Sequence, residues 1–327
     1  MQRNHHTSAP ARRRTGGFTL LELLIAITII GILAGLLLPA IGNVRTNARN
    51  AQVRVEITGL EGALNDFKAK YGDYPPSRIT LFRNATAWKA NTAEARRSRG
   101  ILKKFWQDIN FDALSNHWNA DVELRGAECL VFFLGGLSKG DTDALRGDLI
   151  GFSNNPANPF DRTSSNRTGP FFEFYLDRLR DAFETSPTYR FQTYVDTLPG
   201  QNTPYLYTTS YDGRGYEIDE TNLIQWDVTG TGSATHTYAQ PNRLRRGAYL
   251  QSGKLGDGTF WKNKSFQIIS PGADQRFGEG GLWTEATGDE SLVKEAPDPY
   301  GPTGAKIDRR DERDNITNFH SGVLAPN

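Results

Sequence analysis

An apolar segment near the N-terminus, residues 18–42, constrains this chain more than any other feature. Its 25 residues contain one ionisable side chain, Glu22, and about 20 apolar residues suffice for a helix to cross a bilayer. Arginines at positions 12–14 precede it and no acidic residue comes before Glu22, so the N-terminal flank is predicted to lie in the cytoplasm. A charge inside the hydrocarbon costs about 2.5–3.5 kcal/mol on insertion scales. The segment therefore predicts a transmembrane helix in which Glu22 needs a partner.

Three kinds of segment compete to explain this run of residues. A secretory signal has an apolar core of about 7–15 residues, which is shorter than the run seen here. A plain signal anchor fits the length but explains neither Glu22 nor the sequence Gly16-Gly17-Phe18. The stretch Gly17-Phe18-Thr19-Leu20-Leu21-Glu22 fits the third kind, because it resembles the processing site of type IV prepilins and type II secretion pseudopilins.

This resemblance implies a maturation step and an assembly role. In that family prepilin peptidase cuts after the glycine and methylates the new amine, which here places the cut between Gly17 and Phe18. Glu22 would then pair with the Phe18 ammonium of a neighbouring copy, since two opposite charges in good geometry offset much of their desolvation cost. The implied partners are prepilin peptidase, copies of the chain in a filament, other pseudopilins and an inner-membrane assembly platform.

Composition narrows the possible functions further. Four of the 38 basic residues lie in residues 1–17, so the remainder carries 34 basic and 37 acidic residues, a net charge of −3. General nucleic-acid binding requires an excess of positive charge, which this chain lacks, so we expect no nucleic-acid partner. The one cysteine, Cys129, excludes an intrachain disulfide. Because it lies in an apolar run, we expect it to be a small core residue.

A second, amphipathic helical pattern follows the apolar segment. Apolar residues recur mostly at intervals of three and four, which predicts one buried helix face. Glycine and paired prolines after Tyr71 predict the end of the helix, and this turn also resembles that of the major pseudopilin. The apolar positions are Val44, Ala48, Ala51, Val55, Leu60, Leu64, Phe67 and Tyr71.

The rest of the chain divides by residue pattern. Residues 84–106 read as helical and basic, residues 128–136 as a short buried helix or strand, and residues 154–170 as a loop. From about Pro204 onward, aromatic and β-branched runs predict strands. We therefore expect an α+β fold, with a long N-terminal helix packed on a C-terminal antiparallel sheet and a large inserted region. The expected regions are a leader (1–17), a transmembrane or filament-core helix (18–42), its amphipathic continuation (43–72), a variable insertion (73–200) and a β-rich C-terminal region (201–327).

Two C-terminal stretches suggest a metal site. The runs ending at Asp274 and beginning at Asp314 resemble the two ends of a calcium-binding loop of major pseudopilins. The resemblance implies Asp274 and Asp314 as ligands, with backbone carbonyls near Ile269 or Ser270 and oxygens around Asp311 and Asn315 completing the shell. Calcium takes six to eight oxygen ligands. Asn315 stands where the family usually has an aspartate, and an insertion of about thirty residues separates the two ends, so an acidic solvated loop is the alternative.

Catalytic patterns are scarce. The histidines His117, His236 and His320 lack metal-protease spacing, and no Gly-x-Ser-x-Gly motif occurs. We expect no enzyme, but a structural subunit of a type II secretion-like pseudopilus, anchored by one span in the bacterial inner membrane with its globular part in the periplasm. The alternatives are a minor type IV pilin and a membrane-anchored binding protein or enzyme that uses the insertion.

Overall fold

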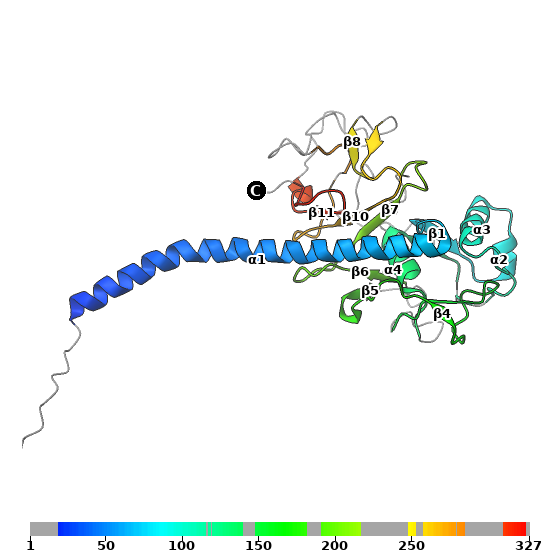
Figure 1. Ribbon diagram of the computed structural model, residues 1–327, viewed down its shortest axis with the longest axis horizontal. Helices are drawn as coiled ribbons and strands as arrows, with labels where there is room; N and C mark the ends of the chain where they lie inside the picture. The colour runs from blue at the N-terminus through cyan, green and yellow to red at the C-terminus, as the bar shows by residue number, and fades with distance from the viewer. Residues whose placement is uncertain are drawn as a thin grey trace, which may run out of the picture. The chain divides into compact units, whose positions relative to one another are not determined.

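The computed structural model describes residues 19–115, 117–118, 120–139, 148–181, 191–216, 248–252, 258–278, 280–284 and 310–324. The chain divides into two compact units, Met1–Ala48 and Arg49–Asn327. Helix α1 (Leu20–Tyr71) contributes its first part to one unit and its second part to the other (Figure 1). Each unit is described by itself.

The second unit is built from short elements that follow α1. Three further α-helices are described, α2 (Ala85–Lys89), α3 (Ala93–Phe105) and α4 (Gly126–Gly135). The strands are β1 (Arg78–Leu81), β2 (Val122–Arg125), β3 (Phe152–Ser153), β4 (Arg167–Thr168), β5 (Leu179–Asp181), β6 (Gln192–Tyr194), β7 (Leu206–Thr209), β8 (Leu250–Ser252), β9 (Thr259–Phe260), β10 (Phe266–Ser270) and β11 (Ile316–Thr317). Two short 3-10 helices are η1 (Leu176–Arg178) and η4 (Arg310–Glu312).

The second part of α1 buries one face and ends where the sequence predicts. Its buried large side chains are Val53, Ile57, Leu60, Leu64 and Phe67, at intervals of three and four. The helix ends at Gly72, whose φ of 88° is left-handed and whose N–H donates to the Lys68 carbonyl at 2.7 Å. Glycine tolerates this conformation, which is a common way for helices to end.

The prediction of which α1 residues lie on the buried face is wrong at Val55. Leu60, Leu64 and Phe67 are buried as expected, but Val55 is 74% exposed. With 100° of turn per residue, the stripe through Val53 and Ile57 leaves residue 55 on the opposite side of the helix. Ala51 is exposed as well. The buried stripe therefore begins at Val53, and Val53 and Ile57 were not among the predicted positions.

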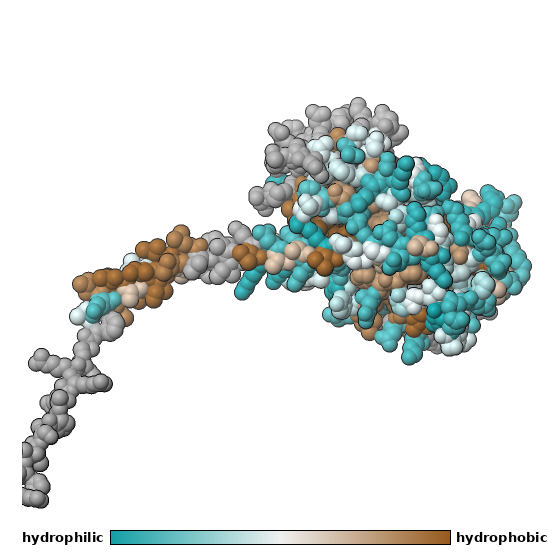
Figure 2. Space-filling model, viewed as in Figure 1, coloured by the Kyte–Doolittle hydropathy of each residue, from teal (hydrophilic) through white to brown (hydrophobic). Residues whose placement is uncertain are grey.

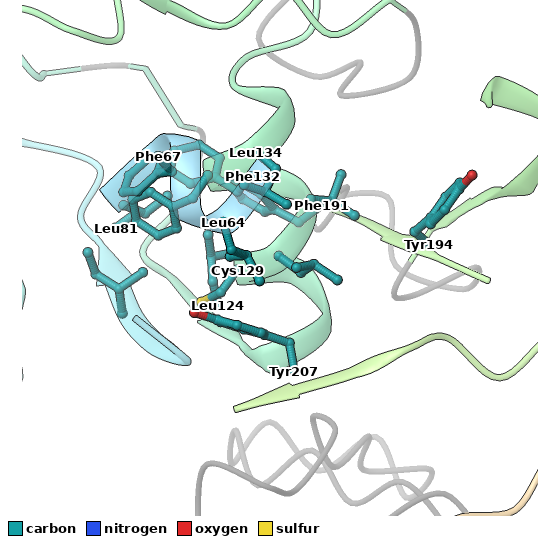
Figure 3. Packing of buried hydrophobic residues seen from close by; sticks show 14 of the residues in the cluster. Leu64, Phe67, Leu81, Leu124, Cys129, Phe132, Leu134, Phe191, Tyr194 and Tyr207 are labelled. Carbon is teal, nitrogen blue, oxygen red and sulfur yellow. The ribbon is translucent and has the colours of Figure 1, made fainter. Parts of the chain in front are cut away.

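Helix α4 forms the centre of the hydrophobic core. All ten of its residues are buried, including Cys129, which confirms the expected core position of the cysteine. Figure 3 shows Cys129, Phe132 and Leu134 of α4 gathered with Leu64 and Phe67 of α1. A side chain at Gly126 would bring its Cβ to 2.0 Å from the Tyr207 carbonyl oxygen. The first residue of α4 must therefore be glycine for the helix to approach β7 this closely.

The described strands form small antiparallel sheets. The C-terminal region supplies a three-stranded sheet of order β11-β10-β7, in which Phe266 pairs with Thr209 and Ile269 with Thr317. The α+β class is confirmed. Four further two-stranded ladders, β1-β2, β3-β4, β5-β6 and β8-β9, are described, three of them within the insertion. The predicted helical stretch at 84–106 contains α2 and α3, and residues 128–136 form most of α4.

A buried carboxylate on α1 ties the helix to the insertion. Glu56 Oε2 accepts hydrogen bonds from Tyr205 Oη at 2.6 Å and Arg178 Nη1 at 2.8 Å, and Oε1 accepts from Tyr194 Oη at 2.9 Å. Arg178 Nη2 also contacts Oε1, so the pair is bidentate. The Glu56 and Arg178 side chains are 8% and 14% exposed. We call Glu56, Arg178, Tyr194 and Tyr205 the Glu56 clasp.

Replacing Glu56 by Gln should lower the free energy of unfolding by about 3 kcal/mol, because it leaves the Arg178 charge buried without its counter-ion. Urea unfolding followed by circular dichroism measures this loss. Asp66→Asn, an exposed carboxylate on the same helix, is the matched control and should stay within about 0.5 kcal/mol of the parent. Equal effects of the two substitutions would contradict the role assigned to the clasp.

A second buried acid predicts how stability depends on pH. Glu128, in the first turn of α4, is 4% exposed and accepts from the Arg125 N–H at 3.1 Å. Burial raises the pKa of its carboxyl to about 7. Between its ordinary value and about 7 the folded state binds the extra proton, so the free energy of unfolding should fall as pH rises through this range.

The decrease should be on the order of 3 kcal/mol between pH 4.5 and pH 8. Glu128→Gln stays neutral at every pH and should flatten this part of the profile. The measurement is chemical unfolding of both proteins at a series of pH values. Parallel profiles for the parent and the variant would show that Glu128 does not titrate in this range.

Candidate functional site

The first candidate site lies at the start of α1. Gly17 and Phe18, the predicted cleavage residues, lie outside the described residues. Glu22 is described and has a local partner, Thr19. The Thr19 N–H and Oγ1 both donate to Glu22 Oε2 at 3.0 Å, and the Glu22 N–H donates to Thr19 Oγ1 at 3.2 Å. This reciprocal pair is a capping box, which satisfies backbone donors that a helix start leaves unpaired.

The first turns of α1 expose apolar side chains on every side of the helix. Their exposed fractions run from 49% at Ile25 to 83% at Leu20, and the visible face of the helix is mostly brown in this stretch in Figure 2. A helix that is apolar all round is normally buried in a membrane or a protein core. These exposed side chains are Leu20, Leu21, Leu23, Leu24, Ile25, Ile27, Ile29, Ile30, Ile32, Leu33 and Leu36.

The structure does not confirm the predicted transmembrane helix. Among the residues whose placement is described, no helix is both long enough and apolar enough to cross a bilayer.

The second candidate site is the loop after β10, where two of the predicted metal ligands meet. Asp314 Oδ2 accepts from the Ala273 N–H at 2.5 Å and from the Asp274 N–H at 3.0 Å. Gly272 has a φ of 68°, and a Cβ there would lie 2.4 Å from the Asp314 carboxyl carbon. Only glycine leaves room for this close approach, so the loop is shaped to hold the Asp314 carboxylate against its backbone.

Asp311 joins the same acidic cluster through an arginine. Arg276 Nη1 lies 3.4 Å from Asp311 Oδ2, and the Arg276 N–H donates to Asp274 Oδ1 at 2.8 Å. Partial desolvation and then the charges of Asp314 and Asp311 raise the pKa of the Asp274 carboxyl to about 7. Burial and the charge of Asp311 raise the pKa of Asp314 too. The cluster therefore concentrates negative charge, which is the electrostatic condition for cation binding.

A buried network that the sequence analysis missed supports this loop. Asp196 is 1% exposed, and its Oδ2 accepts from Ser270 Oγ at 2.5 Å and Gln201 Nε2 at 3.1 Å. Gln201 Nε2 also donates to the Gly272 carbonyl at 3.0 Å, and the Gly272 N–H donates to Ser270 Oγ at 3.2 Å. Asp196 thus supports the Gly272 turn through hydrogen bonds that pass by way of Ser270 and Gln201.

The donor set fits calcium in chemistry but is not arranged as a complete ligand shell. Asn315 is buried, and its Nδ2 donates to Tyr249 Oη and the Phe277 carbonyl, while its Oδ1 has no hydrogen-bond donor in the described structure. An amide oxygen of this kind and the carboxylates of Asp274, Asp311 and Asp314 are the hard oxygens that calcium prefers. However, the described residues contain no group of three or more His, Cys, Asp or Glu side chains placed to share one ion.

The backbone positions proposed for the shell lie in a sheet. Ile269 and Ser270 are part of β10 and pair with Thr317 and Ile316 of β11. Asp274, Asp311 and Asp314 therefore stay predictions as ligands, and the contributions expected from Ile269 and Ser270 stay predictions as well.

Comparison with known proteins assigns the N-terminal site. Residues 12–38 match the prokaryotic N-terminal methylation motif, which places the chain among the pilin-like proteins. The chain is 38% identical over 113 residues to type II secretion system core protein G of Klebsiella pneumoniae, a match that covers 34% of this chain and 75% of that one. The chain belongs to the pseudopilin family of type II secretion system core protein G.

Two further relatives carry the same name. The protein of Aeromonas hydrophila is 35% identical over 100 residues, which is 30% of this chain and 68% of the relative. That of Dickeya chrysanthemi is 30% identical over 138 residues, 40% of this chain and 84% of the relative. No solved structure matches the chain significantly. These relatives leave 60% or more of this chain without a counterpart.

Two features of these sites escaped the sequence analysis for different reasons. The pattern Thr19-x-x-Glu22 matches the sequence signature of a capping box, so this cap could be predicted from the sequence. Asp196 carries no local signal, because an aspartate beside a threonine and a turn reads as a solvated loop residue. Its burial depends on Gln201 and Ser270, which the fold brings to it.

Proposed function

We propose that this chain is a structural subunit of a type II secretion pseudopilus and not an enzyme. Prepilin peptidase cuts it between Gly17 and Phe18 and methylates Phe18, and the mature chain polymerises through residues 18–42. The filament contains copies of this chain and other pseudopilins, and grows on an assembly platform in the inner membrane. The observation that carries this proposal is the all-round exposure of large apolar side chains from Leu20 to Leu36.

The apolar surface must stay out of water before and after assembly, because exposing one Leu or Ile side chain to water costs about 1.5–3 kcal/mol. Lipid covers the helix first and the same helix of neighbouring copies covers it later, and close packing and polar pairs favour the second state over the first. Before assembly, the 25 residues from 18 to 42 stay in the inner membrane, with the arginine-rich flank at positions 12–14 on the cytoplasmic side. The globular second unit then lies in the periplasm.

Glu22 gives the assembly its register. Cleavage creates an ammonium at Phe18, and in a bundle of apolar helices this group and a carboxylate of another copy attract each other strongly. A buried pair of this kind is most valuable as a device that selects one alignment over others. The capping box with Thr19 is a second role for the same carboxylate, and the two roles can be separated by mutation.

Glu22→Gln should stop or strongly reduce filament assembly, because it removes the charge that pairs with the Phe18 ammonium. The helix start should stay intact, because glutamine can take the place of glutamate in a capping box. Thr19→Ala is the matched control. It removes the cap at a cost of about 1 kcal/mol but keeps the carboxylate, so it should assemble nearly as the parent does. Filament yield after shearing and electron microscopy measures both.

Mass spectrometry of each protein must first show a methylated Phe18 N-terminus, so that a processing defect is not mistaken for an assembly defect. An uncut parent chain would overturn the proposed maturation. Equal assembly losses in the two variants would show that Glu22 acts through the helix start alone.

We further propose that Asp274, Asp311 and Asp314 bind calcium as a structural ion. Bound calcium would neutralise the carboxylate cluster and brace the Gly272 loop, which no disulfide can do in a chain with one cysteine. The support is the chemistry of these oxygens and their concentrated charge.

Excess calcium should therefore raise the melting temperature of the chelator-treated protein by a few degrees, because a ligand that binds only the folded state stabilises it. Asp274→Asn should abolish this shift, whereas Asp66→Asn, an exposed carboxylate of α1, should retain it. Differential scanning calorimetry with calcium and with chelator provides the comparison. An unchanged melting temperature for the parent would exclude a stabilising site.

A further inference from the structure

A cleft of about 540 Å³ lies beside α3 in the second unit, and none of its lining residues belongs to the sites described above. Its wall is formed by α3, by the turn that follows α1 and by the turn that follows β7. Its volume falls in the range of small-ligand pockets, about 300–1,000 Å³. Four basic residues line it, Arg96, Arg97, Lys104 and Arg214, with a single acidic residue, Asp73. We call it the basic cleft.

Two arginines of the basic cleft, Arg96 and Arg214, have neutral hydrogen-bond partners. Asp73 is already committed to Lys104, whose Nζ lies 2.9 Å from its carboxylate. Arg96 donates to the carbonyl and the side-chain oxygen of Asn91 at 3.0 and 2.8 Å, and Arg214 Nε donates to the Tyr211 carbonyl at 3.1 Å. These partners are neutral, and neither arginine has a carboxylate partner in the described part of the chain. The basic cleft therefore attracts an anion.

Tyr211 organises the guanidinium groups of the basic cleft. The centre of the Arg97 guanidinium lies 5.4 Å, and that of Arg214 5.8 Å, from the centroid of the Tyr211 ring, within cation–π distance. Arg97 Nη2 donates to Tyr211 Oη at 3.1 Å, and the Ser77 N–H donates to the same oxygen at 3.3 Å. Tyr211 has a φ of 47°, which is uncommon for a tyrosine. The turn thus holds the ring within cation–π distance of two arginines in a strained backbone conformation.

The chemistry of the walls identifies the class of anion. Besides its charged groups, the basic cleft is lined by apolar side chains, which include Ile101 and the buried Phe105 and Tyr216. Guanidinium groups bind carboxylates through two parallel hydrogen bonds, and the apolar lining suits apolar side chains next to them. A nucleic acid would need a basic stripe extending beyond the cleft, whereas the chain after residue 17 carries a net charge of −3.

We propose that the basic cleft binds an acidic peptide segment, in which two or more carboxylates flank apolar side chains. The chain carries one sequence of this composition itself. Residues 285–298 contain five acidic residues and one lysine around Leu292 and Val293. Because its charge complements that of the basic cleft, this run is the occupant that we assign, and an acidic segment of another protein is the outcome that the test below separates from it. The inference goes beyond the proposed function, because subunit assembly through α1 does not require the basic cleft.

The binding test uses the full chain in detergent and a fluorescein-labelled peptide of residues 285–298, followed by fluorescence polarisation. The peptide should bind, and binding should weaken with salt, whereas the same peptide with its five acids changed to amides should not bind. The double variant Arg96→Gln with Arg214→Gln should bind at least about tenfold more weakly, since it loses charge-assisted hydrogen bonds. Lys70→Gln with Lys103→Gln is the matched control: both lysines are exposed and outside the basic cleft, and its affinity should equal that of the parent.

A third variant separates the two sources of the peptide. In the full chain whose own run 285–298 carries amides in place of its five acids, peptide affinity should rise if that run is the occupant. Unchanged affinity assigns the basic cleft to an acidic segment of another protein.

Three outcomes would overturn the proposal. They are no binding to either the parent or the amide-bearing chain, equal binding to both double variants, and displacement of the peptide by inorganic triphosphate more effective than by unlabelled peptide. Because none of these measurements depends on filament formation, a failure here is distinct from a failure of the pseudopilus proposal.

Discussion

The carboxylate of Glu56 is the interaction on which the arrangement of the second unit depends. It projects from α1 and is held by groups 122, 138 and 149 residues further along the chain, at Arg178, Tyr194 and Tyr205. Burying a charge so completely is tolerable only because an arginine and two hydroxyls satisfy it together. The helix, the end of the insertion and the approach to β7 are thus tied at one point.

The elements that could be predicted from the sequence are those with local signals. The end of α1 at Tyr71-Gly72, the core position of Cys129 and the presence of strands after Pro204 follow from turn residues and apolar runs. The start of the buried face was misplaced, because the alternative spacing through Val55 looks equally periodic in sequence. The Glu56 clasp could not be predicted, since no local rule brings residue 178 or 205 to residue 56.

The candidate sites divide in the same way. A resemblance in two short runs was enough to bring Asp274 and Asp314 to one loop, and the structure does place them together. The network beneath them, centred on Asp196, depends on side chains that meet only through the strand pairing of the C-terminal sheet. The basic cleft likewise joins α3 to a turn more than a hundred residues later. In each case a local sequence pattern identifies one of the interacting segments, and only the tertiary structure shows which distant residues it contacts.

The capping box at the start of α1 changes how the energetics of Glu22 should be counted. A carboxylate bound to Thr19 of its own chain already has a satisfied reference state. In the proposed filament, pairing with a neighbouring copy would exchange one partner of Glu22 for another, so the carboxylate would add only the difference between the two states to the free energy of assembly.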